Sequence, residues 1–468
     1  MMRRSSARRD GLLSVVVLVL LLVWTSGADT GTVVVGKEPA AMKEARAAFE
    51  QRQYERTVEL LDRLSKESVL PVDGMRLKSR AFLKMGKPKE ALREYDHLEQ
   101  TLKQDDAALL KEVSLGFVVT LTKDMREQMR GASYTALKDL ESPEVVPYLE
   151  DGLSDGSGLV RALVVEGLGR TEQGRRSPKL RKALDDQAGL VRAAVLKVLG
   201  RSRDRSVLPL LEKALNEDQP VVRLAASGAL YHMGRTAMWD RVRKAATAVH
   251  PEERATALRL LGELKDPRAL PVLVEAVKDP QPSVRGAAAS ALGDLGESQA
   301  VPQLEEALQD TIPAVRTSAA ISLGELGHTM VSPALRRALS DTNPVVQAAV
   351  VSALLRLGEP IEIVMPSVVE LIQHNDPGTR SAIAKALGRA HGENRARAVA
   401  VLSELLGDPI PRPRIAAARS LGHIGGQELI PVLKRALHDE DDAVRATAGG
   451  ALGRLLNASS RATHAAKI

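Results

Sequence analysis

The chain has 468 residues, a formal net charge of +7, no cysteine, and only three Phe, five Tyr and two Trp. The lack of cysteine excludes disulfides, thiol catalysis and Cys-ligated zinc. Four arginines and Asp10 give residues 1–28 a net charge of +3, which leaves 7 − 3 = +4 on the other 440 residues. So small an excess is only weak evidence for a polyanionic partner, and we expect no nucleic-acid partner.

Residues 1–28 have the three-part pattern of a secretory signal peptide. A basic stretch precedes an apolar run at 12–24, and small residues follow at Ser26 and Ala28. The run is shorter than the about 20 residues that a spanning helix needs. We therefore expect export to the periplasm or the medium after cleavage. Retention of the segment as a membrane anchor is the alternative.

After a polar linker at 29–39, residues 40–104 predict two helical hairpins. Apolar and turn residues there recur 34 positions apart, as in Phe49/Leu83, Tyr54/Pro88 and Leu61/Tyr95. This spacing resembles that of tetratricopeptide repeats.

From about 105 to 456 the sequence repeats eleven times, with an arginine every 31 residues through most of the segment. The arginines are Arg130, Arg161, Arg192, Arg223, Arg254, Arg285 and Arg316, then Gln347 in the same place, then Arg380, Arg414 and Arg445. An acidic residue stands six places before most of them: Asp124, Asp155, Asp186, Glu217, Asp279, Asp310, Asp341, Asp408 and Asp439. A fixed period of this length is typical of stacked-repeat solenoids.

Each unit predicts two helices. In one unit, Pro282 opens a helix whose apolar residues share one face, and Gly296 ends it where a left-handed residue is favoured. Pro302 then opens a second helix, and Asp310 begins the next unit.

This Asp-x5-Arg pattern resembles the HEAT repeat, in the short bacterial form also found in phycobilisome-lyase-type proteins. The resemblance implies an all-α superhelical solenoid with first helices outside and second helices lining the concave side. Residues 457–468 are expected to form a flexible tail.

The acidic and arginine series predicts a structural ladder. A carboxylate at a helix start and an arginine one turn inside it can pair with each other and with neighbouring units, and the carboxylate also favours the helix N-terminus. We expect these pairs to fix the register between units; a row of phosphate-binding arginines is the alternative. The breaks at Gln347, Arg254 and Arg380, the last two lacking the acidic residue, are the better functional leads.

No catalytic or metal-binding motif is superimposed on the repeats. The nine histidines form no His-Glu dipeptide and no H-x3-H pair, and G-x-S-x-G and G-x4-G-K-[ST] motifs are missing. Deoxyhypusine hydroxylase, which the array resembles in fold, binds iron through repeated His-Glu pairs. We therefore expect a non-enzymatic protein without metal or cofactor, with a lyase-like or enzyme-accessory role as the alternative.

Binding of a protein or peptide is the favoured function, on the second helices. Their exposed residue pairs alternate in sign, which suits a partner of mixed charge; the candidates are Arg181, Lys182, Glu305, Glu306, Arg336, Arg337, Lys434 and Arg435. Trp239 lies in an irregular stretch at 237–243 and is either an interface anchor or core filler. Longer spacings predict extra loop residues at 374–379 and 392–395.

Overall fold

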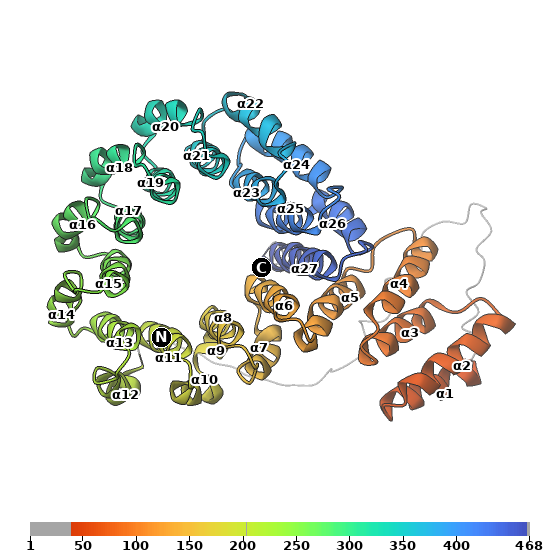
Figure 1. Ribbon diagram of the computed structural model, residues 1–468. Coiled ribbons are helices and arrows are strands. Elements are labelled where there is room, and N and C mark those ends of the chain that lie inside the picture. Colours follow the sequence, from red (N-terminus) through yellow and green to blue (C-terminus); the bar gives the residue numbers. More distant parts are fainter. Residues whose placement is uncertain (1–38, 203, 466–468) are drawn as a thin grey trace, which may run out of the picture.

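The computed structural model describes residues 39–202 and 204–465, and these contain helices and no strand (Figure 1). The all-α solenoid expected from the sequence is confirmed. The predicted signal segment at 1–28 lies outside the described residues.

Four helices precede the repeats. α1 (Ala40–Glu50) pairs with α2 (Tyr54–Glu67), and α3 (Val72–Lys84) pairs with α4 (Pro88–Leu102). These hairpins project from one side of the larger array, and α3 and α4 pack on α5 (Ala107–Thr120) (Figure 1).

The repeats form two concentric rows of helices (Figure 1). The first helix of each unit lies in the inner row: α6 (Glu127–Leu140), α8 (Gly158–Gly169), α11 (Gly189–Arg201), α13 (Pro220–His232), α15 (Pro251–Leu264), α17 (Pro282–Leu295), α19 (Pro313–Leu326), α21 (Pro344–Arg356), α23 (Pro377–Leu387), α25 (Pro411–Ile424) and α27 (Asp442–Ala465). The second helices lie outside: α7 (Val146–Gly152), α10 (Pro178–Lys182), α12 (Leu208–Ala214), α14 (Met238–Ala245), α16 (Leu270–Ala276), α18 (Val301–Ala307), α20 (Ser332–Ala338), α22 (Ile361–Ile372), α24 (Asn394–Leu405) and α26 (Ile430–Ala436).

The expectation that second helices line the concave side is therefore wrong, and small residues on the first helices explain why. A Cβ on Gly262 would lie 2.6 Å from the carbonyl oxygen of Ala291 on the next inner helix, and one on Gly324 would lie 2.7 Å from Cα of Ala353. Neighbouring inner helices thus approach almost backbone to backbone. The outer helices are more widely spaced, so the array curves toward the first helices (Figure 1).

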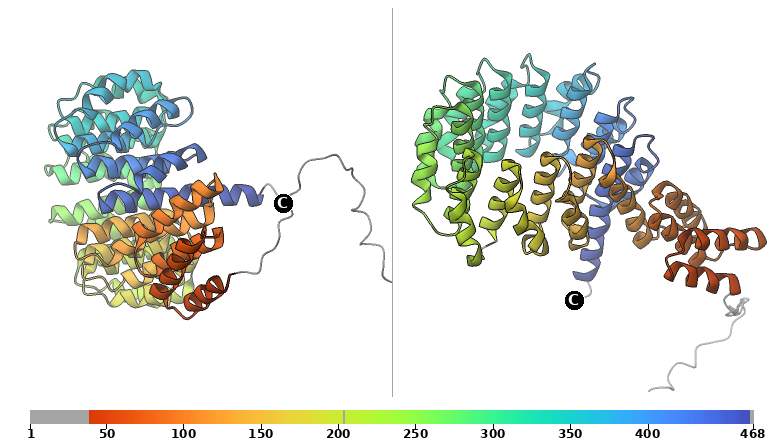
Figure 2. Two further views of the ribbon diagram at one scale, coloured as in Figure 1. Left: turned by 90° about the vertical axis from the view of Figure 1, so that its right-hand side faces the viewer. Right: turned by 60° about the horizontal axis from the view of Figure 1, so that its bottom comes forward.

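The curvature brings the two ends of the array together and closes it into a ring. α27 packs on α5 and on α6, whose residues lie more than 300 positions earlier in the chain (Figures 1 and 2). No second helix follows α27 among the described residues, and α5 covers it instead. A Cβ on Gly450 would lie 2.8 Å from Ala136 Cβ, and one on Gly453 would lie 2.7 Å from Leu140 Cδ2, so the seam repeats the close approach of the other units.

Three further expectations differ from the structure. α27 continues through Ala465, where a flexible tail was expected from 457. The longer spacings after Gln347 do not make extended loops. Instead they lengthen the outer helices: α22 and α24 have 12 residues each, against seven in α16, α18, α20 and α26. The irregular stretch at 237–243 likewise lies largely within an ordinary second helix, α14.

Candidate functional site

The arginine ladder links each unit to the next. Nε of Arg285 lies 2.6 Å from Oδ2 of Asp310 in the following unit, and its Nη2 lies 3.0 Å from Oδ1. Its Nη1 donates to the carbonyl oxygen of Asp279 in its own unit, at 2.9 Å. The Arg285 guanidinium holds the pKa of Asp310 below its usual value. Each arginine therefore binds the backbone of its own turn and the carboxylate of the next turn.

The same geometry recurs along the array. Arginine-to-carboxylate contacts of 2.6–3.0 Å join Arg130 to Asp155, Arg161 to Asp186, Arg192 to Glu217, Arg254 to Asp279, Arg316 to Asp341, Arg380 to Asp408 and Arg414 to Asp439. Because these cations already have partners, the ladder is a framework for the ring.

The break at Gln347 replaces one ion pair of the ladder. Gln347 stands in the arginine position, and His374 stands in the acidic position that such an arginine would reach. The amide of Gln347 still donates to the carbonyl of Asp341 at 2.9 Å. Asp376 instead caps α23, accepting from the amides of Gly378 and Thr379. The arginine and the acidic residue of this one ladder pair are thus both replaced, by Gln347 and His374.

The missing acidic residue before Arg254 removes an ion pair from the arginine of the preceding unit, Arg223. Ala248 stands in the acidic position, so Arg223 has no ladder carboxylate, and its Nη2 lies 3.9 Å from Glu253. Arg254 itself keeps its partner in the next unit, Asp279.

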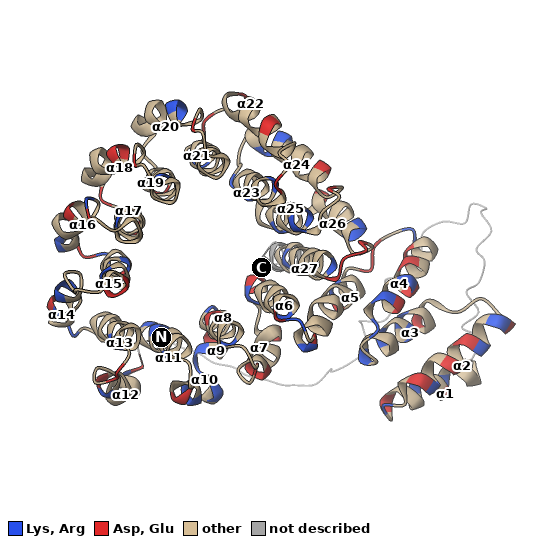
Figure 3. Ribbon diagram, viewed as in Figure 1, with Lys and Arg blue, Asp and Glu red and all other residues tan. Residues whose placement is uncertain are grey.

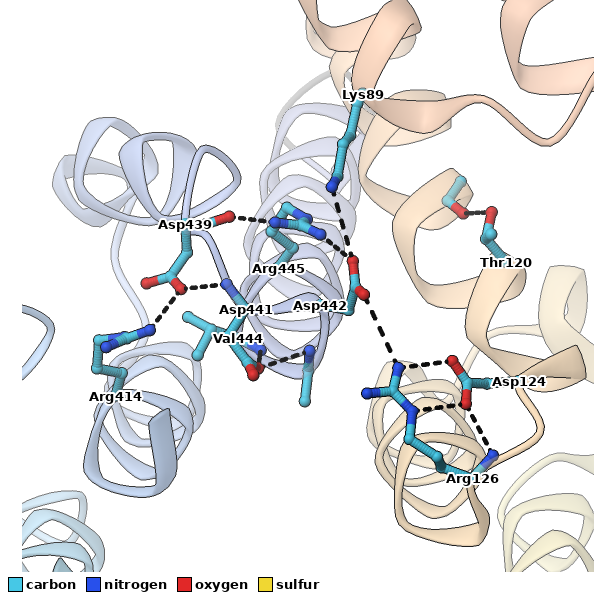
Figure 4. Close-up of polar contacts among 12 residues, drawn as sticks. Lys89, Thr120, Asp124, Arg126, Arg414, Asp439, Asp441, Asp442, Val444 and Arg445 are labelled. Atoms are coloured by element: carbon cyan, nitrogen blue, oxygen red, sulfur yellow. Dashed lines mark hydrogen bonds and ion pairs between the residues drawn. The ribbon is translucent and has the colours of Figure 1, made fainter. Parts of the chain in front are cut away.

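The ladder ends at the seam, where other ion pairs replace it (Figure 4). Arg445 turns to Asp442 of its own helix and to the carbonyl of Asp439, and does not reach Asp124 in the first unit. Asp124 pairs with Arg126 at 2.9 Å, and Asp442 lies 3.9 Å from Arg126. The last and first units therefore meet through Asp442 and Arg126.

Residues of the N-terminal hairpins brace the seam from outside. Lys434 on α26 lies 2.5 Å from Glu99 of α4 and 2.8 Å from Asp105. Lys89 on α4 lies 4.0 Å from Asp442 (Figure 4). Lys434, a candidate for partner binding on sequence grounds, is thus a seam residue.

The other predicted binding residues lie on the outer helices. Arg181 and Lys182 are on α10, Glu305 and Glu306 on α18, Arg336 and Arg337 on α20, and Arg435 on α26. The structure does not gather them on one concave surface. Arg181 pairs with Asp204, and Arg336 pairs with Glu359.

Trp239 is a core residue. Only 7% of it is exposed, and the guanidinium carbon of Arg268 lies 4.4 Å from its ring centroid. A buried side chain covered by an arginine cannot anchor a partner.

The inner surface instead displays apolar side chains that the sequence analysis did not single out. Four exposed residues occupy the position two before the repeat arginine or its replacement: Leu159, Leu190, Val221 and Val345. Ile321 is exposed on α19. The sequence could have revealed these residues. An apolar residue recurs two positions before the repeat arginine, where the helical pattern places it away from the core.

Outside the ladder, charge on the inner helices is biased toward one sign in each of two arcs, and Figure 3 marks the charged residues by colour. The acidic arc, on α15, α17 and α19, comprises Glu252, Glu263, Asp294 and Glu325, and it also contains one exposed arginine outside the ladder, Arg259 of α15. The basic arc, on or directly after α21, α23, α25 and α27, comprises Arg356, Lys385, Arg389, Arg412, Arg419 and Arg454. Those four helices contain a single acidic residue, Asp442.

Within the acidic arc, partial burial and then the carboxylates of Glu325 and Glu263 raise the pKa of Asp294. Glu263 also accepts from Lys197 of α11 at 2.9 Å, across the intervening α13. Side chains two units apart can meet in this way because the surface is concave.

A groove of about 500 Å³ crosses α19, α21 and α23 between the two arcs. Its lining includes the buried Ala348, Ala349 and Ala386 and the exposed Ile321 and Val345. The volume lies in the range of about 300–1,000 Å³ that ligand sites occupy.

Lys385, Arg389 and Arg412 line one side of this groove. In the part of the chain that the structure describes, none of the three pairs with a carboxylate. Burial, followed by the charges of Arg412 and Arg419, lowers the pKa of Lys385 from its usual value. The groove therefore holds three cations against one lining carboxylate, that of Asp376, beside apolar surface.

Within residues 39–202 and 204–465, no group of three or more His, Asp or Glu side chains is arranged to hold a metal ion. No described helix has the length and apolar character needed to cross a membrane.

Comparison with solved structures gives similar helical arrays at low identity. Human deoxyhypusine hydroxylase in complex with glycerol is 22% identical over 54% of this chain and 98% of its own, with a TM-score of 0.30. The complex of CpcE and CpcF of phycocyanin lyase from a Nostoc species is 22% identical over 46% and 94%, with a TM-score of 0.36. A Kap121p mutant is 14% identical over 88% and 55%, with a TM-score of 0.38.

No curated protein matches the sequence. The family model for HEAT repeats matches residues 114–195, 177–248, 240–322, 307–365 and 398–464, which together make up more than half of the chain. The paired helices, the inter-unit ladder and this match lead to one conclusion: the chain belongs to the HEAT-repeat family.

Proposed function

We propose that the protein is a non-enzymatic scaffold that binds a protein partner on the inner surface of its ring. The observation that carries the proposal is the composition of that surface. Exposed apolar residues recur along the inner helices; beside them, carboxylates predominate on α15, α17 and α19, and cations predominate on α21, α23, α25 and α27. Apolar contact area with charges of both signs suits a folded or extended protein segment, because apolar contacts supply affinity and charge pattern supplies orientation.

The position of the partner can be mapped by photo-crosslinking. A photoreactive residue is placed on the inner helices at Ser290 or Ser352, and on the outer helices at Glu306 or Arg337 as matched controls. We expect partner adducts from the inner positions and none from the outer ones. Adducts formed mainly at Glu306 and Arg337 would contradict binding inside the ring.

We also propose that this scaffold works outside the cytoplasm. Support comes from the basic, apolar and small-residue segments of 1–28. The mature protein is expected to begin at Asp29 on N-terminal sequencing. Retention of residues 1–28 would indicate a membrane-tethered assembly factor instead.

A further inference from the structure

We propose that the groove across α19, α21 and α23 binds a short acidic segment of the partner, with its carboxylates on Lys385, Arg389 and Arg412 and its apolar side chains on Ile321 and Val345. This proposal rests on the proposed function and adds the chemical class of the segment and its place on the ring.

The charge of the groove selects an anion. The three cations lie on one side of it, and none has a carboxylate partner among the described residues. The only carboxylate in the lining, that of Asp376, already accepts from the amides of Gly378 and Thr379 and from the Thr379 hydroxyl. An incoming carboxylate would therefore meet donors that are not in use, in a partly desolvated setting that strengthens the contact.

The remaining lining selects a peptide over a nucleic acid. The exposed side chains of Ile321 and Val345 offer apolar contact beside the cations, and no aromatic side chain is present to stack on a base. Glu325 follows at the end of α19, so a long polyanion leaving the groove in that direction would approach the acidic arc. A segment that carries carboxylates at one end and apolar residues at the other fits both features.

The length of the groove favours an extended segment. It runs across three consecutive inner helices, and its buried floor of Ala348, Ala349 and Ala386 keeps side chains short where the backbone of a ligand would pass. These small residues leave room for the main chain of a bound peptide, and the longer side chains of the lining flank it.

The test uses the full-length protein and a fluorescent peptide in which Glu and Leu alternate, measured by anisotropy at low salt. We expect Lys385→Glu/Arg389→Glu to weaken binding by about tenfold or more, because like charges then face each other. The matched control is Lys182→Glu/Arg337→Glu, which makes the same change of charge on the outer helices α10 and α20 and should leave affinity unchanged. Neither pair of cations makes an ion pair, so both variants are expected to retain their helical circular dichroism and melting temperature.

Four outcomes would overturn the inference: unchanged affinity of the groove variant, equal loss in both variants, tighter binding of a peptide with Lys in place of Glu, or tighter binding of a single-stranded DNA oligonucleotide than of the Glu peptide. Failure of the inference is separable from failure of the proposed function. If partner adducts form at the inner position Ser290 while the groove variant binds normally, the inner surface is the binding face and the acidic segment is wrong. If adducts form only at outer positions, the proposed function fails as well.

Discussion

Replacing Gly449 by valine is expected to open the ring. A Cβ at this position would lie 2.4 Å from the backbone carbonyl oxygen of Ser114 on α5, and helix backbone cannot move aside as a side chain can. Overpacking of this kind costs about 1–3 kcal/mol or more. Separation of α27 from α5 at the seam would relieve the clash. We expect a larger radius of gyration in small-angle X-ray scattering, a lower melting temperature and preserved helical circular dichroism.

Gly286→Val is the matched control. Gly286 also lies in an inner helix, but a Cβ there meets only Ser318 Oγ at 3.7 Å and Val315 Cγ2 at 4.0 Å. The radius of gyration of this variant should equal that of the wild type. If Gly449→Val also scatters like the wild type and melts at the same temperature, α27 does not pack on α5 as described.

Replacing Arg285 by alanine is expected to lower the free energy of unfolding by about 2–4 kcal/mol, within the range for breaking a largely buried pair or leaving buried polar groups unsatisfied. The change removes both arginine donors from the carboxylate of Asp310, which keeps only the amide of Ile312, and it leaves the carbonyl oxygen of Asp279 without its donor. Side-chain exposure is only 16% for Arg285 and 12% for Asp310, so water compensates poorly. Urea denaturation followed by circular dichroism measures the effect.

Arg176→Ala serves as the comparison, because Arg176 pairs with Glu172 at the surface, with 79% and 69% of the side chains exposed. Removal of an exposed pair should cost about 0–1 kcal/mol. Equal effects of Arg285→Ala and Arg176→Ala would mean that the ladder does not hold neighbouring units together.

Periodicity in the sequence was enough to predict the helical units, because each unit is defined by local signals. Pro282 and Gly296 mark the ends of α17, and the recurring arginine fixes the register. The carboxylate partner of each arginine was harder to predict from the sequence. The acidic residue six places earlier belongs to the same turn, yet its carboxylate serves the preceding unit.

The inward and outward faces could not be read from the repeat itself. Curvature depends on a small difference in spacing between the two rows, and that difference comes from glycines such as Gly262 and Gly324, whose neighbours are known only in three dimensions. The binding residues expected on second helices were displaced to the outside for this reason.

Ring closure is also a cumulative property, since it depends on the sum of small rotations over eleven units. A signal for it was nevertheless present. Open arrays end in units with a polar outer face, whereas here Ala136 and Leu140 at one end and Leu452 and Gly453 at the other keep the interior pattern. The two ends cover each other in place of caps.

Zero-length carbodiimide coupling of the unmodified protein tests the closed ring most directly. Lys434 lies 2.5 Å from Glu99 and 2.8 Å from Asp105, so an amide bond from Lys434 to Glu99 or Asp105 should form within the monomer at every protein concentration. Lys111 and Glu144, 2.7 Å apart and close in sequence, provide the internal standard. Coupling of Lys111 to Glu144 without any intramolecular bond from Lys434 to Glu99 or Asp105 would contradict the closed ring.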